Sequence, residues 1–146
     1  MPAHRIQLKG PWEVFPPQVN ALRSDAEQKP ETHTMPKEWR ELFGDQGGTA
    51  RFQRKFHRPS NLEPHERIFL AFSGIRGETR IRLNQRQLGE FDAQGGSIEV
   101  ELTSNMNSFN TLEVEIDFDP GQSPGLPGGL FGVVALEIRW DDLQRN

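Results

Sequence analysis

The sequence predicts an all-β protein, an antiparallel sandwich or barrel, and three observations support this. Apolar and polar residues alternate with a period of two in five separate segments after Arg51. Short segments that contain Gly or Asn, typical of turns, separate most of them. No segment after Arg51 keeps a helical period. Strands with one apolar and one polar face are typical of antiparallel sheets, because parallel strands are usually buried on both faces.

The alternation places strands over 51–58, 67–73, 78–84, 87–92, 97–102, 111–118 and 133–140. The segment 36–43 predicts one short helix, because Pro36 stands in its first turn and Gly44 follows as a stop. Residues 16–35 are polar and lack periodicity, so a long loop is expected there. Residues 119–132 predict a second long loop, rich in Gly and Pro. A loop of this length in a compact domain is usually functional or mobile.

Length and composition exclude several classes of protein. The 146 residues fit one domain, 1–146, and the absence of Cys excludes disulfides, thiolate zinc sites and cysteine nucleophiles. A net charge of −4 without a basic block argues against a nucleic-acid partner. No run of 18 apolar residues is present, so no membrane partner is expected. The N-terminus shows no apolar leader, so the expected location is the cytoplasm.

The sequence offers no catalytic residue. A glycosidase needs two carboxyl groups across a cleft, one of them with a raised pKa. The carboxylates in the alternating segments fall instead on the predicted wet face of strands, where pairing with Arg80, Arg82 or Arg139 is expected. These carboxylates are Glu99, Glu101, Glu113, Glu115 and Asp117. Ser73 lacks the Gly-x-Ser-x-Gly context of a hydrolase nucleophile.

No metal or cofactor is expected either. The four histidines lack the spacing of metal ligands. Asp45, Asp92 or Asp119 could contribute to a structural calcium site, but no loop has a calcium-binding motif. The Gly pairs precede predicted strands rather than helices, so no phosphate-binding loop is expected.

A series of short motifs along the chain carries a resemblance. In order they are LKGPW (8–12), MPKEW (35–39), GTARFQRKF (48–56), LAFSG (70–74), RLN (82–84), LG (88–89), GG (95–96) and GVVALE (132–137). Together they resemble the N-terminal sugar-binding domain of glycoside hydrolase family 2. The resemblance implies a jelly-roll β-sandwich of the galactose-binding-like type with about eight strands. In that family a neighbouring barrel carries the catalytic carboxylates, and no barrel is expected here. The usual Asn-Gly turn of the family reads Asn84-Gln85, and its common aromatic in the second strand is Phe52 rather than Tyr.

The predicted topology brings certain loops together. Because strands alternate in direction, loops 44–50, 74–77, 93–96 and 119–132 share one end of the sandwich. Binding residues concentrate in loops held by a rigid scaffold, and a sugar needs convergent hydrogen-bonding groups beside an apolar platform. Trp39 or Phe131 could provide that platform. The candidate ligand-binding residues are Trp39, Asp45, Gln46, Arg76, Asp92, Gln94, Asp119 and Gln122. The alternative is that the polar groups are solvated turn residues and that Trp39 belongs to the core.

The resemblance implies a non-catalytic, carbohydrate-binding domain whose partner is a sugar. The alternative is a protein-interaction or structural domain that keeps the fold without binding sugar. The fold alone does not decide between them.

Overall fold

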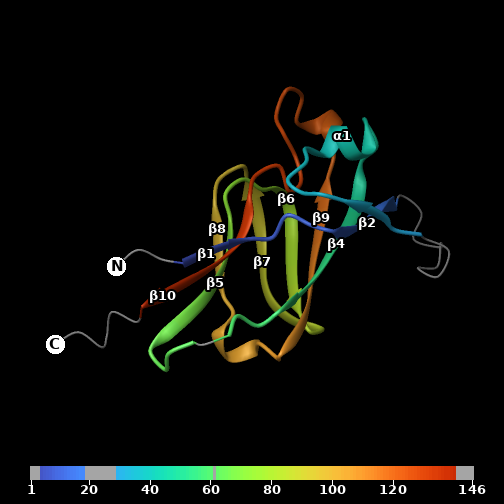
Figure 1. Ribbon diagram of the computed structural model, residues 1–146. Helices are drawn as coiled ribbons and strands as arrows, with labels where there is room; N and C mark the ends of the chain where they lie inside the picture. The colour runs from blue at the N-terminus through green and yellow to red at the C-terminus, as the bar shows by residue number, and fades with distance from the viewer. Residues whose placement is uncertain (1–3, 19–28, 61, 141–146) are drawn as a thin grey trace.

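The computed structural model describes residues 4–18, 29–60 and 62–140, which form a sandwich of two antiparallel sheets (Figure 1). The four-stranded sheet has the order β1 (His4–Gln7), β10 (Val134–Trp140), β5 (Glu66–Phe72), β8 (Ile98–Glu101). The six-stranded sheet has the order β3 (Glu31–His33), β2 (Trp12–Gln18), β4 (Gly48–His57), β9 (Phe109–Phe118), β6 (Arg76–Leu83), β7 (Arg86–Gln94). A helix, α1 (Trp39–Phe43), and two single turns, η2 (Thr103–Asn105) and η3 (Pro120–Gln122), complete the described elements.

The structure confirms the predicted fold class, an antiparallel jelly-roll sandwich. The seven predicted strands correspond to β4 through β10, and the predicted helix corresponds to α1. The long loop expected over 16–35 was partly wrong, because its first residues complete β2 and residues 31–33 form β3. Strand β3 pairs with β2 through its backbone, with His33 opposite Trp12, and its side chains show no alternation. Residues 19–28 of that segment lie outside the described residues. Within the described part of the chain no helix has the length and apolar character needed to cross a membrane.

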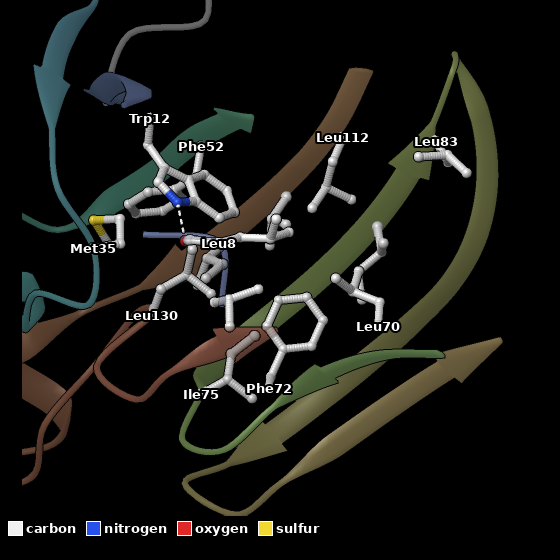
Figure 2. Packing of buried hydrophobic residues seen from close by; sticks show 14 of the residues in the cluster. Leu8, Trp12, Met35, Phe52, Leu70, Phe72, Ile75, Leu83, Leu112 and Leu130 are labelled. Carbon is white, nitrogen blue, oxygen red and sulfur yellow. Dashed lines mark hydrogen bonds between the residues drawn. The ribbon is translucent and has the colours of Figure 1, made fainter. Parts of the chain in front are cut away.

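The core lies between the two sheets (Figure 2). Inward residues of β4, β6 and β9 meet those of β5 and β10, as the two-residue alternation requires. Trp12 is fully buried, and its indole Nε1 donates a hydrogen bond to the carbonyl of Leu8 at 2.8 Å. Phe52 and Phe72 are among the largest buried side chains. This packing fixes the sheets as a scaffold from which the loops project.

The strand register gathers four connections at one end of the sandwich, which we call the loop end (top of Figure 1). Gly48, where β4 begins, lies opposite Phe118, where β9 ends. In the same way Arg76 at the start of β6 pairs with Gln94 at the end of β7. Phe72 at the end of β5 pairs with Val134 and Ile98 at the starts of β10 and β8. The connections that precede β4, β6, β8 and β10 therefore meet there, as the sequence predicts.

Candidate functional site

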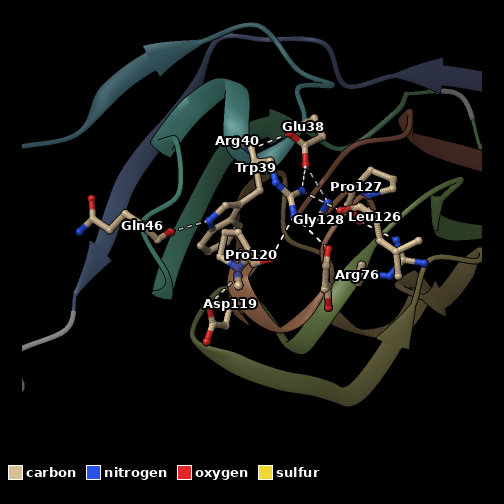
Figure 3. Close-up of polar contacts among 12 residues, drawn as sticks. Glu38, Trp39, Arg40, Gln46, Arg76, Asp119, Pro120, Leu126, Pro127 and Gly128 are labelled. Carbon is tan, nitrogen blue, oxygen red and sulfur yellow. Dashed lines mark hydrogen bonds and ion pairs between the residues drawn. The ribbon is translucent and has the colours of Figure 1, made fainter.

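The long connection between β9 and β10 is held by α1. Glu38 caps this helix, since its carboxylate accepts a hydrogen bond from the backbone N–H of Arg40 at 2.7 Å. The same carboxylate accepts from the Arg40 guanidinium at 2.9 Å and from the backbone N–H of Gly128 at 3.1 Å (Figure 3). Arg40 in turn donates to three loop carbonyls, those of Pro120 (3.2 Å), Ser123 (2.9 Å) and Leu126 (2.7 Å). The Glu38–Arg40 pair therefore fixes the loop over residues 120–128.

Arg76 holds the same loop from the side of β6. Its guanidinium donates to the carbonyls of Pro127 at 2.6 Å and Gln94 at 2.9 Å. Its backbone exchanges two hydrogen bonds with Gly129, at 3.0 and 3.2 Å. Gly95 has a φ of +100°, and a Cβ there would collide with the Arg76 guanidinium, so the turn requires glycine. Arg76, predicted to bind ligand, thus joins two loops through its guanidinium.

Trp39 does not provide an exposed aromatic platform, and that prediction was wrong. Its side chain is fully buried, and its Nε1 donates to the carbonyl of Gln46 at 2.8 Å. Its ring lies edge-on to Phe43 and Phe118, with centroids 4.9 and 5.4 Å apart. A large ring with its N–H satisfied gains most by burial, so Trp39 forms the core beneath the loop end. The side-chain amide of Gln46 donates to the carbonyl of Pro17 at 3.1 Å.

Asp92 does not belong to the loops, and Gln94 lies at their margin. Strand β7 stays paired with β6 as far as Gln94, so Asp92 lies within the strand opposite Glu78. Its exposed side chain is on the outer face of the six-stranded sheet, the face turned away from the core. Gln94 is exposed at the end of β7. The prediction that Asp92 joins the loop-end group was therefore wrong, because the β6–β7 ladder continues beyond it.

Besides Gln46, which is exposed but bonded to Pro17, three predicted residues are exposed in the loops. Asp45 follows α1, and Gln122 lies in η3. Asp119 caps η3, because its Oδ1 accepts from the backbone N–H of Gly121 at 2.9 Å. We call these three residues and Gln94 the rim of the loop end; Phe131, in the same long connection, is half-buried, and its ring centroid lies 5.9 Å from the guanidinium carbon of Arg76. Among the described residues, no three His, Asp or Glu side chains are placed so that together they could hold a metal ion.

The outer face of the six-stranded sheet carries two hollows. One, the acidic hollow, has a volume of about 280 Å³ and contains five carboxylates around a single guanidinium. These groups belong to Arg80, Glu78, Glu90, Asp92, Glu115 and Asp117. The other, the amide hollow, has a volume of about 600 Å³. It is lined by Gln53, Arg82, Asn84, Gln85, Thr111 and Glu113.

The predicted cross-strand ion pairs are present on both outer faces. Arg80 pairs with Glu90 at 2.8 Å and with Glu115 at 3.0 Å, and Arg82 pairs with Glu113 at 3.0 Å. On the four-stranded sheet Arg139 of β10 pairs with Glu99 of β8 and, within its own strand, with Glu137.

The Arg139 pairing bears on catalysis. Hydrogen bonding from Arg139 lowers the pKa of Glu99. A glycosidase acid needs the opposite shift, so Glu99 is suited to an ion pair rather than to proton donation.

Comparison with known proteins identifies the fold. No protein-family model and no curated protein sequence matches the chain. Among solved structures it resembles a candidate β-galactosidase from Bacteroides fragilis, with 19% identity and a TM-score of 0.77 over 94% of this chain and 23% of that one. It also resembles a β-glucuronidase from Bifidobacterium dentium complexed with coumarin-3-O-glucuronide, with 20% identity and a TM-score of 0.73 over 93% of this chain and 30% of that one. A third is a glycosyl hydrolase family 2 member from Bacteroides cellulosilyticus, with 16% identity and a TM-score of 0.70 over 92% of this chain and 20% of that one.

These likenesses show a fold that occurs within glycosidase chains, including one of glycoside hydrolase family 2. The chain spans 20–30% of the length of these three proteins. Its architecture therefore corresponds to one part of a larger glycosidase, as the sequence motifs predict.

Sequence reasoning missed two groups of residues. Glu38 and Arg40 lie in the predicted helix, but no local pattern shows that Arg40 reaches carbonyls 80 or more positions away. Gln53 and Thr111 fall on the polar side of predicted strands, where they resemble ordinary solvated residues. Gln85 carried the one usable signal, because it replaces the glycine expected in the family's turn.

Proposed function

We propose that the protein is a non-catalytic carbohydrate-binding domain. The observation that carries this proposal is the extent of the structural likeness, which covers 92–94% of this chain in the three glycosidase structures. Their names describe enzymes that act on glycosides, and this chain spans less than a third of each. A domain of this fold that recognises a sugar without cleaving it accounts for both facts.

The loop end is the proposed position of the sugar. Its rim presents the carboxylates of Asp45 and Asp119 and the amides of Gln94 and Gln122, which can accept from and donate to hydroxyl groups. Phe131, which is half-buried in the same long connection as Asp119 and Gln122, offers an aromatic ring near Arg76. The rim carries two negative charges on a chain of net charge −4, which favours a neutral glycoside over a glucuronide.

The hydrogen bonds that Arg40 and Arg76 donate to loop carbonyls support sugar binding at the loop end indirectly. They order the backbone of the 119–132 loop before any ligand arrives. A site that is already ordered loses less conformational freedom on binding, and this reduces the free-energy cost of association.

The arrangement of carboxylates supports a role without catalysis. Glu113 and Glu115 each lie within 3.0 Å of an arginine on an open sheet face. Neither faces a second carboxyl group across an enclosed cleft of the kind that glycoside hydrolysis needs.

Titration calorimetry on the whole chain tests the proposal. We expect methyl β-D-galactoside to release heat at millimolar concentration and methyl β-D-glucuronide to release less. Gln122→Ala removes one exposed amide of the rim and should weaken binding about fivefold, the equivalent of one hydrogen bond. Gln7→Ala, at an exposed glutamine on β1, is the matched control and should bind like the native protein. Absence of heat with every sugar in a neutral and acidic panel would sink the proposal.

A protein-interaction domain is the second candidate, and one observation favours it. Ile6 on β1 is 42% exposed and Trp140 on the adjoining β10 is 40% exposed. Exposed large apolar side chains on neighbouring strands are typical of contact surfaces when they form a patch. Analytical ultracentrifugation of the chain and of Ile6→Ser distinguishes this candidate, which predicts association that the substitution reduces.

A further inference from the structure

The amide hollow has the size and composition of a ligand site. Its volume of about 600 Å³ lies within the range of roughly 300–1,000 Å³ found for small-molecule sites. Three strands and one turn contribute to it: Gln53 comes from β4, Arg82 from β6, Thr111 and Glu113 from β9, and Gln85 from the β6–β7 turn. The hollow therefore rests on the rigid part of the sandwich rather than on a loop.

Several polar groups in this hollow have no partner within the described part of the chain. The side chains of Gln53, Thr111 and Gln85 make no hydrogen bond to any described residue. Gln53 and Thr111 are nevertheless half-buried. The adjacent Arg82–Glu113 pair, 3.0 Å apart, offers further donors and acceptors in a fixed position. Amides, a hydroxyl and an ion pair of this kind can both donate hydrogen bonds to the hydroxyl groups of a sugar and accept hydrogen bonds from them.

Gln85 gives an independent indication. The β6–β7 hairpin has a two-residue turn with positive φ at both positions, 52° at Asn84 and 71° at Gln85. Such turns favour Asn followed by Gly, because a side chain at the second position is strained. Asn84 is held by hydrogen bonds to Thr111 and Asn110, each 2.9 Å long. Gln85 makes no side-chain hydrogen bond to another described residue, yet it lines the hollow. Strain retained in this way points to a functional use of the side chain.

We propose that the amide hollow is a second carbohydrate site, specific for a short neutral oligosaccharide, and that Gln53, Gln85 and Thr111 contact it. The ligand class rests on the proposed function, whereas the position rests on the hollow itself. Glu113 lies 3.0 Å from Arg82 and 3.9 Å from Arg51 and offsets part of their positive charge, and the neighbouring acidic hollow disfavours an anion. No lining residue is aromatic, so hydrogen bonds supply the affinity and the Kd is on the order of 1 mM.

The experiment uses the whole ¹⁵N-labelled chain with maltotriose, cellotriose and xylotriose, followed by nuclear magnetic resonance and calorimetry. We expect one of them to shift the side-chain amide signals of Gln53 and Gln85. Gln53→Ala and Gln85→Gly should each weaken binding about fivefold. Gln85→Gly should also raise the Tm or leave it unchanged, because glycine relieves the positive φ, so loss of binding cannot be attributed to loss of fold. Gln7→Ala is the matched control.

The outcomes separate this inference from the proposed function. Weakening by Gln53→Ala and Gln85→Gly, with native binding in Gln122→Ala, supports the amide hollow. Weakening by Gln122→Ala alone overturns the hollow and leaves carbohydrate binding at the loop end intact. No shift and no heat with any saccharide overturns both.

Discussion

The loop end and the amide hollow both gather polar side chains, but the two regions use them differently. At the loop end Arg40, Arg76 and Gln46 donate hydrogen bonds to backbone carbonyls of their neighbours. In the amide hollow Gln53 and Thr111 leave their side chains unengaged by the rest of the described protein. A polar residue in a loop is thus no better evidence of a binding site than one on a strand.

The difference follows from how each backbone is satisfied. In a β-strand in the middle of a sheet, the backbone N–H and C=O groups form hydrogen bonds with the neighbouring strands. No side chain is needed to satisfy them, so the side chains are free for other contacts. An irregular segment such as 119–132 has no ladder, and its carbonyls need donors from elsewhere. Arg40 and Arg76 provide those donors. Their guanidinium groups stabilise the loop and are therefore not available to bind a ligand.

The largest expected effect tests the buried layer beneath the loop end. Trp39→Ala should lower the free energy of unfolding by about 3–5 kcal/mol, since it removes a fully buried ring and its hydrogen bond. Urea denaturation measures this. Trp39→Phe, which keeps most of the ring volume, should cost clearly less. A near-neutral Trp39→Ala would contradict the assignment of Trp39 to the core.

The next effect tests whether Arg40 is structural. Arg40→Ala should cost about 2–3 kcal/mol, because three carbonyls and the Glu38 carboxylate lose a charged donor. Amide hydrogen exchange should accelerate over residues 120–128 and stay unchanged in β5. If exchange over residues 120–128 is the same in Arg40→Ala as in the native protein, the loop is ordered without Arg40.

A smaller effect is expected at the amide hollow. Gln53→Ala and Thr111→Ala should each change the free energy of unfolding by no more than about 0.5 kcal/mol, because neither side chain has a hydrogen-bond partner among the described residues. Chemical denaturation under the conditions used for Arg40→Ala gives a direct comparison. A cost similar to that of Arg40→Ala would remove the distinction between the two regions.

The smallest effect concerns the exposed ion pair between Arg139 and Glu99. The pKa of Glu99 is lowered in the folded state by hydrogen bonding from Arg139, so the unfolded chain binds the proton more readily. The pair's contribution is complete above the ordinary pKa of 4.5 and disappears as the pH falls below it. Because the pair is exposed, Glu99→Gln should cost only a few tenths of a kcal/mol at pH 7. Denaturation at pH 7 and pH 3 should show a smaller difference at the lower pH. A larger deficit at pH 3 would contradict this sign.

The sequence by itself determined the layers of this protein. Alternation along β4 to β10 decides which side chains face the core, because successive residues of a strand point to opposite sides. The same alternation predicted the pairing of Arg80 and Arg82 with carboxylates on the wet face, and strand direction predicted the shared loop end.

Only the tertiary structure decided which polar groups are available. Arg40 meets Ser123 and Arg76 meets Pro127 across long intervals of chain, and no local pattern encodes such contacts. Trp39 was placed in the core by rings from β9 and from its own helix. The hollow around Gln53 exists only because β4, β9 and β6 lie side by side in one register. Periodicity is a property of one strand. Whether a polar side chain is available to a ligand depends instead on whether neighbouring segments have unsatisfied hydrogen-bonding groups that it must bind.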